Sequence, residues 1–204
     1  MGVMRRLEYH RYGPPSVLWL AECPTPEPAR GEVTVRVAAA AVNALDWKMR
    51  RGQMRWVTGW RFPRGIGQDF AGEVEAVGPG VDQFQVGDPV FGSAGWAAGA
   101  FAESVVVGAG HLARKPPEVS FEQAAALPIV GVTALQVLDK AGIGPGHAVF
   151  VNGAAGGVGR AAVQLARDRG ATVGGSVRDP SAEPLAAALS PAVGFDFLPA
   201  AFEQ

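Results

Sequence analysis

Cysteine and histidine, the residues that most often build metal and disulfide chemistry, are scarce in this 204-residue sequence, which holds one Cys and three His. The lone Cys23 cannot form a disulfide within the chain, and it cannot supply the cysteine cluster of a structural zinc site. The sequence is therefore typical of a protein from a reducing compartment.

Long hydrophobic runs and an excess of one charge are also missing. No stretch approaches the roughly 18 apolar residues of a membrane helix, and the first arginines are not followed by the apolar run of a signal peptide. The 18 Lys and Arg balance 19 Asp and Glu, for a net charge of -1, whereas a nucleic-acid surface or an electrostatic membrane anchor needs a basic excess. We therefore expect a soluble, cytoplasmic protein that binds neither nucleic acid nor membranes.

Turn-forming and apolar residues are abundant. The chain has 28 Gly and 16 Pro, and 48% of its residues are hydrophobic while 18% are charged. Such a composition supports a packed core with many turns and excludes disorder as the main state.

The first half of the sequence alternates as half-buried strands do. Residues 32–37 place three valines on one face, and residues 70–77 repeat the pattern. Shorter strand candidates follow at 89–91 and 101–107, separated by glycine-rich turns. This spacing predicts a small β-barrel or sandwich that ends near the Pro116-Pro117 pair, a plausible domain boundary.

After this pair the hydrophobic period becomes helical. Ser120 with Glu122 or Gln123 predicts the capping box of a helix over 121–127, and a second helical piece covers 132–138. The next segments predict a β-α-β-α-β order, which is typical of a parallel sheet; the strands are 147–151, 171–177 and 193–197, and the helices are 158–169 and 181–189.

The sharpest local signal is a G-x-x-G-x-x-G spacing that begins at Gly153, between a predicted strand and a predicted helix. Glycines there allow a tight turn and a close approach of backbone to phosphate, and the free N–H groups of the helix face a pyrophosphate. A glycine turn can also serve packing alone, but the strand before it and the helix after it favour a dinucleotide site. The candidate cofactor-binding residues are Gly153, Ala155, Gly156, Gly157 and Val158.

The side chains at the end of the following strand determine whether a dinucleotide site prefers NADP or NAD. Ser176 can donate to a 2′-phosphate and Arg178 can pair with it, whereas Asp179, which could bind the ribose diol of NAD, lies a little late. We therefore favour NADPH, with Ser176 and Arg178 as further cofactor-binding residues.

Four stretches taken together resemble the zinc-independent medium-chain dehydrogenase/reductases, in particular the NADPH-dependent quinone oxidoreductase and enoyl-reductase branch. They are Val42–Gly52, Gly67–Gly72 with the turns up to Asp88, Ala124–Ala134, and the glycine turn. The resemblance covers nearly the whole chain. It implies an α/β protein with an N-terminal GroES-like β-barrel catalytic domain over 1–117, a partial Rossmann domain over 118–204, and the substrate between them.

The resemblance also implies site residues. It places Asn43 near the nicotinamide ribose and the substrate, Thr133 near the carboxamide end of the cofactor, and Asp46 and Trp47 at the substrate cleft. Asn43, Asp46 and Trp47 are thus the candidate catalytic residues. Read without the resemblance, Asn43 could be a turn residue, Asp46 could cap a helix and Trp47 could belong to the core.

The zinc members of the superfamily have Cys and His among their metal ligands. Residues 43–46 contain no Cys, and Gln68 stands where the zinc branch has His, so we expect no metal. Hydride transfer to an enone needs no metal, because hydrogen bonds can polarise the carbonyl. The resemblance therefore implies NADPH-dependent reduction of a small quinone or α,β-unsaturated carbonyl.

The sequence stops at Gln204, before the second half of a Rossmann domain. We expect a C-terminally short family member whose exposed sheet edges are covered by a second copy or by another chain. Alternatively, a shortened member could have a non-redox catalytic or binding role and no longer use nicotinamide, or the chain could be one part of an assembly.

Overall fold

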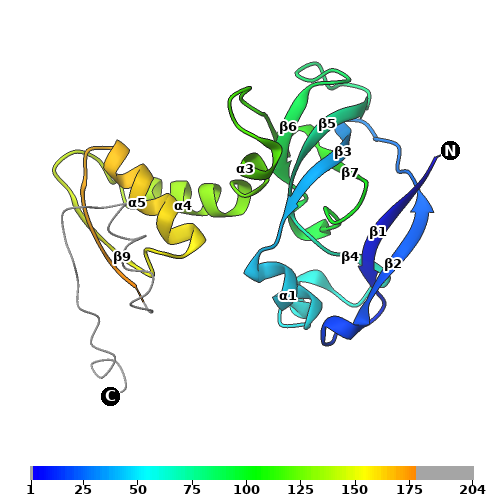
Figure 1. Ribbon diagram of the computed structural model, residues 1–204, viewed down its shortest axis with the longest axis horizontal. Helices are drawn as coiled ribbons and strands as arrows, with labels where there is room; N and C mark the ends of the chain where they lie inside the picture. The colour runs from blue at the N-terminus through cyan, green and yellow to red at the C-terminus, as the bar shows by residue number, and fades with distance from the viewer. Residues whose placement is uncertain (1, 178–204) are drawn as a thin grey trace. The chain divides into compact units, whose positions relative to one another are not determined.

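The computed structural model describes residues 2–177 (Figure 1). The chain divides into two compact units, of which unit 1 extends to Ile129 and unit 2 begins at Val130. Each unit has its own hydrophobic core.

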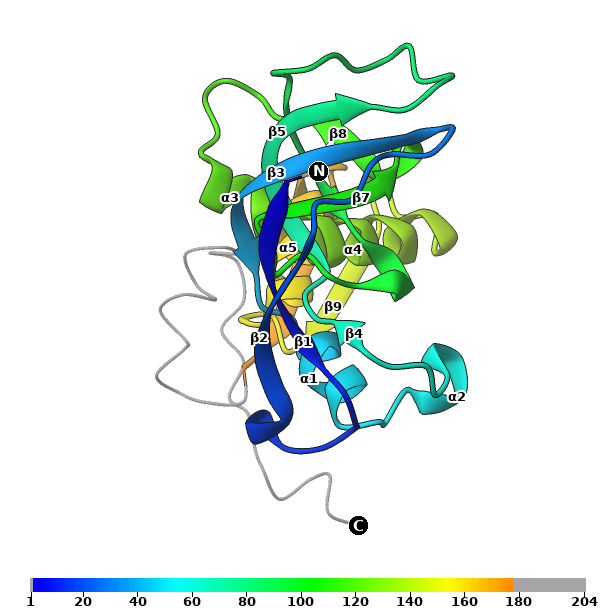
Figure 2. The same ribbon diagram turned by 90° about the vertical axis from the view of Figure 1, so that its right-hand side faces the viewer.

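Unit 1 is built on two antiparallel sheets, in agreement with the β-rich first half expected from the sequence. The larger sheet has the order β7-β3-β5-β6-β8; its strands are β3 (Glu32–Ala41), β5 (Asp69–Val77), β6 (Pro89–Ser93), β7 (Ser104–Gly108) and β8 (Leu112–Arg114). The smaller sheet has the order β2-β1-β4, with β1 (Val3–Tyr9), β2 (Leu18–Pro24) and β4 (Arg64–Gly65). Strands β1 and β2 pair along their full length (Figure 2).

The valine alternation predicted for residues 32–37 is confirmed in β3. Val33 and Val35 are fully buried against Phe70, and Val37 packs at the edge of the same core. No strand is predicted from the sequence over residues 3–24. Strand β2 alternates only between exposed and half-buried residues, so its hydrophobic signal is weak.

Unit 1 also contains α1 (Ala44–Arg50), α2 (Arg55–Thr58), α3 (Phe121–Ala125) and three 3-10 turns over Pro15–Val17, Gly95–Ala97 and Ala109–His111. The capping box of α3 is confirmed, because the Ser120 N–H donates to Gln123 Oε1 at 2.9 Å and the Gln123 N–H donates to Ser120 Oγ at 3.2 Å. Ala124 and Ala125 of α3 pack on Ala71 of β5. Because of this packing, unit 1 extends beyond Pro117, where the proline pair predicts the domain boundary.

Unit 2 contains a parallel strand pair joined by a helix, which confirms the β-α-β order of the described part. Its elements are α4 (Pro128–Lys140), which starts at the end of unit 1, β9 (Ala148–Asn152), α5 (Gly157–Asp168) and β10 (Thr172–Ser176). The core is formed by Leu138, Val163, Ala166 and Val173. The predicted helix at 181–189 and strand at 193–197 lie outside the described residues, and cover of the sheet edges by a second copy or another chain stays a prediction.

Helix α4 begins at Pro128, although the sequence predicts separate helical pieces on either side of this residue. Proline is tolerated in the first turn of a helix, because the N–H that it lacks would have no partner there. At 13 residues α4 is the longest described helix, and none of the helices between residues 2 and 177 combines the length and apolarity needed to cross a bilayer.

Candidate functional site

Two of the predicted catalytic residues, Asn43 and Asp46, form the start of α1. Asn43 has an extended backbone and precedes the helix, and its N–H donates to Asp46 Oδ2 at 2.7 Å. A carboxylate in the first turn is favoured by the helix dipole and satisfies an N–H group that would otherwise have no partner. Asn43 is therefore the N-cap of α1 and Asp46 is its capping-box partner, whereas the alternative read from the sequence had Asp46 itself as the cap.

The side chain of Asn43 is held by Asp69, the first residue of β5. Asn43 Nδ2 donates to Asp69 Oδ2 at 3.0 Å, and the same oxygen accepts the N–H of Ile129 in the first turn of α4 at 2.9 Å. Asp69 is 1% exposed. One buried carboxylate thus joins the segment before α1, the central sheet and the start of α4.

No role for Asp69 is predicted from the sequence, although this residue lies in the Gly67–Gly72 stretch. The available signal was a single charge at the start of a strand whose next three residues, Phe70, Ala71 and Gly72, are all buried. A charged residue in such a place is rarely buried without partners.

Burial controls the protonation of both carboxyl groups. Asp46 is 2% exposed, and loss of solvent raises its pKa to about 6, against the effect of the Asn43 N–H. The nearby Asp69 carboxylate makes a smaller contribution to this rise. Burial also raises the pKa of Asp69, while hydrogen bonds from Ile129, Asn43 and Ser93 oppose that change.

Asp46→Asn is expected to flatten the pH dependence of stability between about pH 4 and pH 6. The pKa of Asp46 rises from 3.8 to about 6 on folding, so in this interval the folded chain retains a proton that the unfolded chain has released. The free energy of unfolding therefore falls as the pH rises through the interval, by about 3 kcal/mol for this group. Urea denaturation at a series of pH values measures the slope, and Asp82→Asn, at an exposed position, is the control. An unchanged slope in Asp46→Asn contradicts the assignment.

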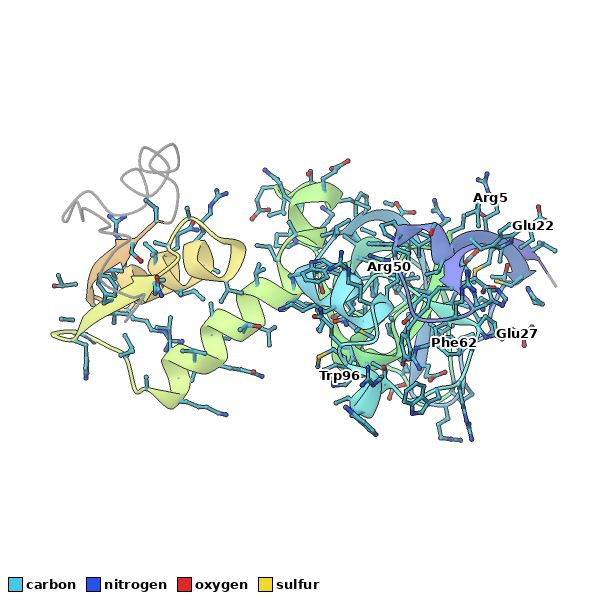
Figure 3. The ribbon with its side chains drawn as sticks, turned by 90° about the horizontal axis from the view of Figure 1, so that it is seen from below. Arg5, Glu22, Glu27, Arg50, Phe62 and Trp96 are labelled. Carbon is cyan, nitrogen blue, oxygen red and sulfur yellow. The ribbon has the colours of Figure 1, made fainter. Side chains whose placement is uncertain are left out.

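Trp47, the third predicted catalytic residue, lies on the exposed side of α1 and not in the core. It is 38% exposed, with the Arg51 guanidinium 5.1 Å and the Lys48 ammonium 5.7 Å from its ring centre. Arg50 of the same helix (labelled in Figure 3) is buried, and its Nη1 donates to the Gly13 carbonyl at 2.5 Å.

The glycine turn joins β9 to α5 in unit 2. Gly153 has a φ of +77°, a conformation that residues with a Cβ rarely adopt. Gly156 precedes the helix and provides no side-chain cap. A Cβ at Gly159 would lie 2.2 Å from the Gly153 carbonyl oxygen, so the first turn of α5 can pack on the loop only without a side chain there.

Ser176 holds this turn from the end of β10. Its hydroxyl donates to Asn152 Oδ1 at 2.7 Å and accepts the Gly153 N–H at 3.4 Å, and its carbonyl accepts the Ala154 N–H at 2.8 Å. At 6% exposure, Ser176 lies inside the turn. Its predicted contact with a 2′-phosphate remains a prediction, and Arg178 lies outside the described residues.

The turn has the features of an anion site. The first N–H groups of a helix have no partner within the helix, and at α5 no side chain of Gly156 fills that place. Gly153, Gly156, Gly157 and Val158 are exposed, and Ala155 is half-buried. Thr133 is an exposed residue of α4. A doubly charged pyrophosphate can therefore reach the backbone amides at the start of α5.

Comparison with known proteins extends over both units. Residues 29–117 match the alcohol dehydrogenase GroES-like domain. The quinone oxidoreductase QR1 of Triphysaria versicolor is 37% identical over 175 residues, covering 81% of this chain and 53% of the relative. The Escherichia coli quinone oxidoreductase complexed with NADPH has a TM-score of 0.82 and 34% identity, covering 91% of this chain and 56% of its own. The CurK enoyl reductase has a TM-score of 0.83 and 31% identity, covering 91% and 57%.

The chain spans about half the length of the quinone oxidoreductases that it matches. The similarity is nevertheless not limited to the GroES-like domain, since the aligned 175 residues are more than unit 1 can supply. The resemblance and the fold class expected from the sequence are confirmed. In sequence and in fold, the chain is similar to the quinone oxidoreductases and enoyl reductases of the medium-chain dehydrogenase/reductase family.

Proposed function

We propose that this protein is an NADPH-dependent oxidoreductase that reduces a small quinone or α,β-unsaturated carbonyl by hydride transfer without zinc. The observation that carries the proposal is the glycine turn between β9 and α5, which presents free backbone amides without side chains to cover them. The identities with quinone oxidoreductases and an enoyl reductase support the reaction class.

In this proposal the amides of Gly157 and Val158 bind the pyrophosphate, and Gly153, Ala155 and Gly156 shape the loop around it, since the Gly156 N–H donates to the Gly153 carbonyl at 2.9 Å. Thr133 contacts the carboxamide end, and Ser176 and Arg178 lie at the 2′-phosphate. The NADPH bound to the Escherichia coli relative supports the choice of cofactor. When bound, NADPH supplies the hydride.

On the substrate side, Asp69 determines the orientation of Asn43. Because Nδ2 of Asn43 is committed to Asp69, the amide plane is fixed, which is the kind of positioning that lowers the entropic cost of a reaction. In this proposal Asp46 and Trp47 lie near the substrate. Reduction of these substrates consumes protons as well as a hydride, and the carboxyl of Asp46, with a pKa of about 6, retains a proton in mildly acidic solution.

The neighbours of Gln68 support metal-independent chemistry. Gln68 is buried, and its Nε2 donates to the sulfur of Met49 at 2.9 Å. An amide paired with a thioether provides none of the thiolate or imidazole ligands that catalytic zinc prefers.

Calorimetric titration with NADPH tests the proposal. Calorimetry is preferable to tryptophan fluorescence, because all five tryptophans lie in unit 1. We expect saturable binding, together with loss of the nicotinamide absorbance when a simple quinone or enone is added. Gly156→Leu should weaken binding by about tenfold or more, because its side chain would cover the amides that make charge-assisted hydrogen bonds.

Gly144→Leu is the matched control, since a Cβ at Gly144 meets no atom within 4 Å, and it should bind NADPH as the wild type does. If the wild-type chain shows no saturable binding at high NADPH concentration, the proposal fails and the non-redox alternative is favoured. Equal affinities of wild type and Gly156→Leu would show that the cofactor binds elsewhere.

A further inference from the structure

Positive charge is concentrated in one segment of this nearly neutral chain. Between Asp46 and Asp69 the sequence has six Lys and Arg residues and no Asp or Glu, so the remainder of the chain is acidic. Arg50 and Arg64 of this segment are held by the carbonyls of Gly13 and Thr58. The other four cations are exposed; they are Lys48, Arg51, Arg55 and Arg61.

The middle of this segment, residues 55–61, exposes apolar side chains beside its cations. Trp56 is 83%, Val57 60% and Trp60 61% exposed. Arg55 and Arg61 are exposed as well and have no acidic partner in the part of the chain that the structure describes. We call these five residues the Trp-Arg patch. Figure 2 shows α2, which carries part of the patch, at the margin of unit 1.

The Trp-Arg patch is held in position by the residues beneath it. The Tyr12 hydroxyl donates to the Gly59 carbonyl and bonds Thr58 Oγ1 at 2.9 Å. The Tyr12 ring packs edge to face on Trp60 at 5.8 Å and on Phe62 (labelled in Figure 3) at 5.1 Å. The Arg55 guanidinium lies 5.6 Å from the Trp56 ring centre and 6.0 Å from that of Trp60. The Trp60 ring is therefore packed on its own chain before any partner binds, which lowers the cost of binding.

We propose that the Trp-Arg patch binds the surface of an anionic phospholipid membrane. Tryptophan partitions into the headgroup region because its ring is apolar and its N–H is polar. Lys and Arg beside it are attracted by anionic headgroups, and exposed apolar side chains add binding energy as they leave water. This proposal departs from the expectation based on total charge, since a net charge of -1 does not report how the charges are distributed.

Two observations favour a membrane over other partners. The rings of Trp56 and Trp60 are almost perpendicular, at 89°, so they do not offer the parallel faces on which successive bases stack. Val57 contributes aliphatic surface, which is useful in a bilayer and not on a nucleic acid. A second copy is disfavoured, because a two-fold contact would place two copies of the same positively charged patch against each other.

Co-sedimentation of the full chain with lipid vesicles tests the proposal. We expect binding to vesicles of phosphatidylcholine with phosphatidylglycerol, much weaker binding to phosphatidylcholine alone, and loss of binding in high salt. Trp56→Ser with Trp60→Ser, and separately Arg55→Gln with Arg61→Gln, should each lower the binding constant by about tenfold or more. Trp19→Ser and Arg30→Gln change exposed residues outside the patch and should bind as the wild type does.

Circular dichroism shows whether each variant is folded. The NADPH titration is measured in parallel, so that loss of cofactor binding and loss of membrane binding are seen as separate results. The proposal is overturned if wild type does not sediment with anionic vesicles, or if the patch variants sediment as wild type does. It is also overturned if an oligonucleotide competes the protein off the vesicles through the same residues, or if the wild type is a dimer that the tryptophan variants dissociate.

Discussion

Gly159→Ala should destabilise unit 2 and weaken NADPH binding by about tenfold or more. The added Cβ would lie 2.2 Å from the Gly153 carbonyl oxygen and 2.9 Å from Ala154 Cα. Both are backbone atoms, so no side-chain rotation relieves the clash, and the loop must move away from the helix. Overpacking of this kind typically costs about 1–3 kcal/mol, and it displaces the amides proposed to hold the pyrophosphate.

Calorimetric titration measures the affinity, and hydrogen exchange of the amides in β9, α5 and β10 measures the local stability. Gly131→Ala is the matched control in unit 2. A Cβ at Gly131 meets no atom within 4 Å, and the residue lies within α4, where alanine is the better helix former. It should therefore be neutral or stabilising. Wild-type protection and affinity in Gly159→Ala would disprove the close approach of α5 to the turn.

Asp69→Ala should lower the free energy of unfolding of unit 1 by about 2–4 kcal/mol. Removal of the buried carboxylate leaves two half-buried donors without their acceptor, the Asn43 amide and the Ile129 N–H. Each buried donor without a partner costs about 1–3 kcal/mol. The five tryptophans all lie in unit 1, so their fluorescence during urea denaturation reports this unit directly.

Asp69→Asn separates the hydrogen bonds from the charge. Its amide oxygen can still accept one or both N–H groups, so the loss should be smaller than that of Asp69→Ala. Asp82→Ala removes an exposed carboxylate and should change the stability by less than about 0.5 kcal/mol. If Asp69→Ala is as stable as Asp82→Ala, the carboxylate does not hold the two segments together.

Local sequence patterns identified much of this fold. The valine alternation of β3, the capping box at Ser120 and Gln123 and the β-α-β run of unit 2 were all readable, because each depends on neighbours within a few residues. Strand β2 was not readable, since one of its faces is exposed and the other is only half-buried.

The candidate site was predicted less completely than the fold. The glycine turn was found because its chemistry is local. The hydrogen bond from the Ser176 hydroxyl to Asn152 was not found, because Asn152 is adjacent in space and distant in sequence. The exposure of Trp47 and of the tryptophans in the Trp-Arg patch was not predicted either. It depends on tertiary packing, since the same tryptophans could have formed a core.

The sequence by itself determined the family resemblance, the order of strands and helices and the place of the glycine turn, because periodicity, caps and glycine spacing act through short stretches of chain. Only the tertiary structure decided that Asp69 of β5 holds both Asn43 and the Ile129 N–H of α4. It also decided that burial raises the pKa of Asp46 to about 6. Both results arise from residues brought together across long separations, and loss of solvent is a property of the folded chain that no single segment carries.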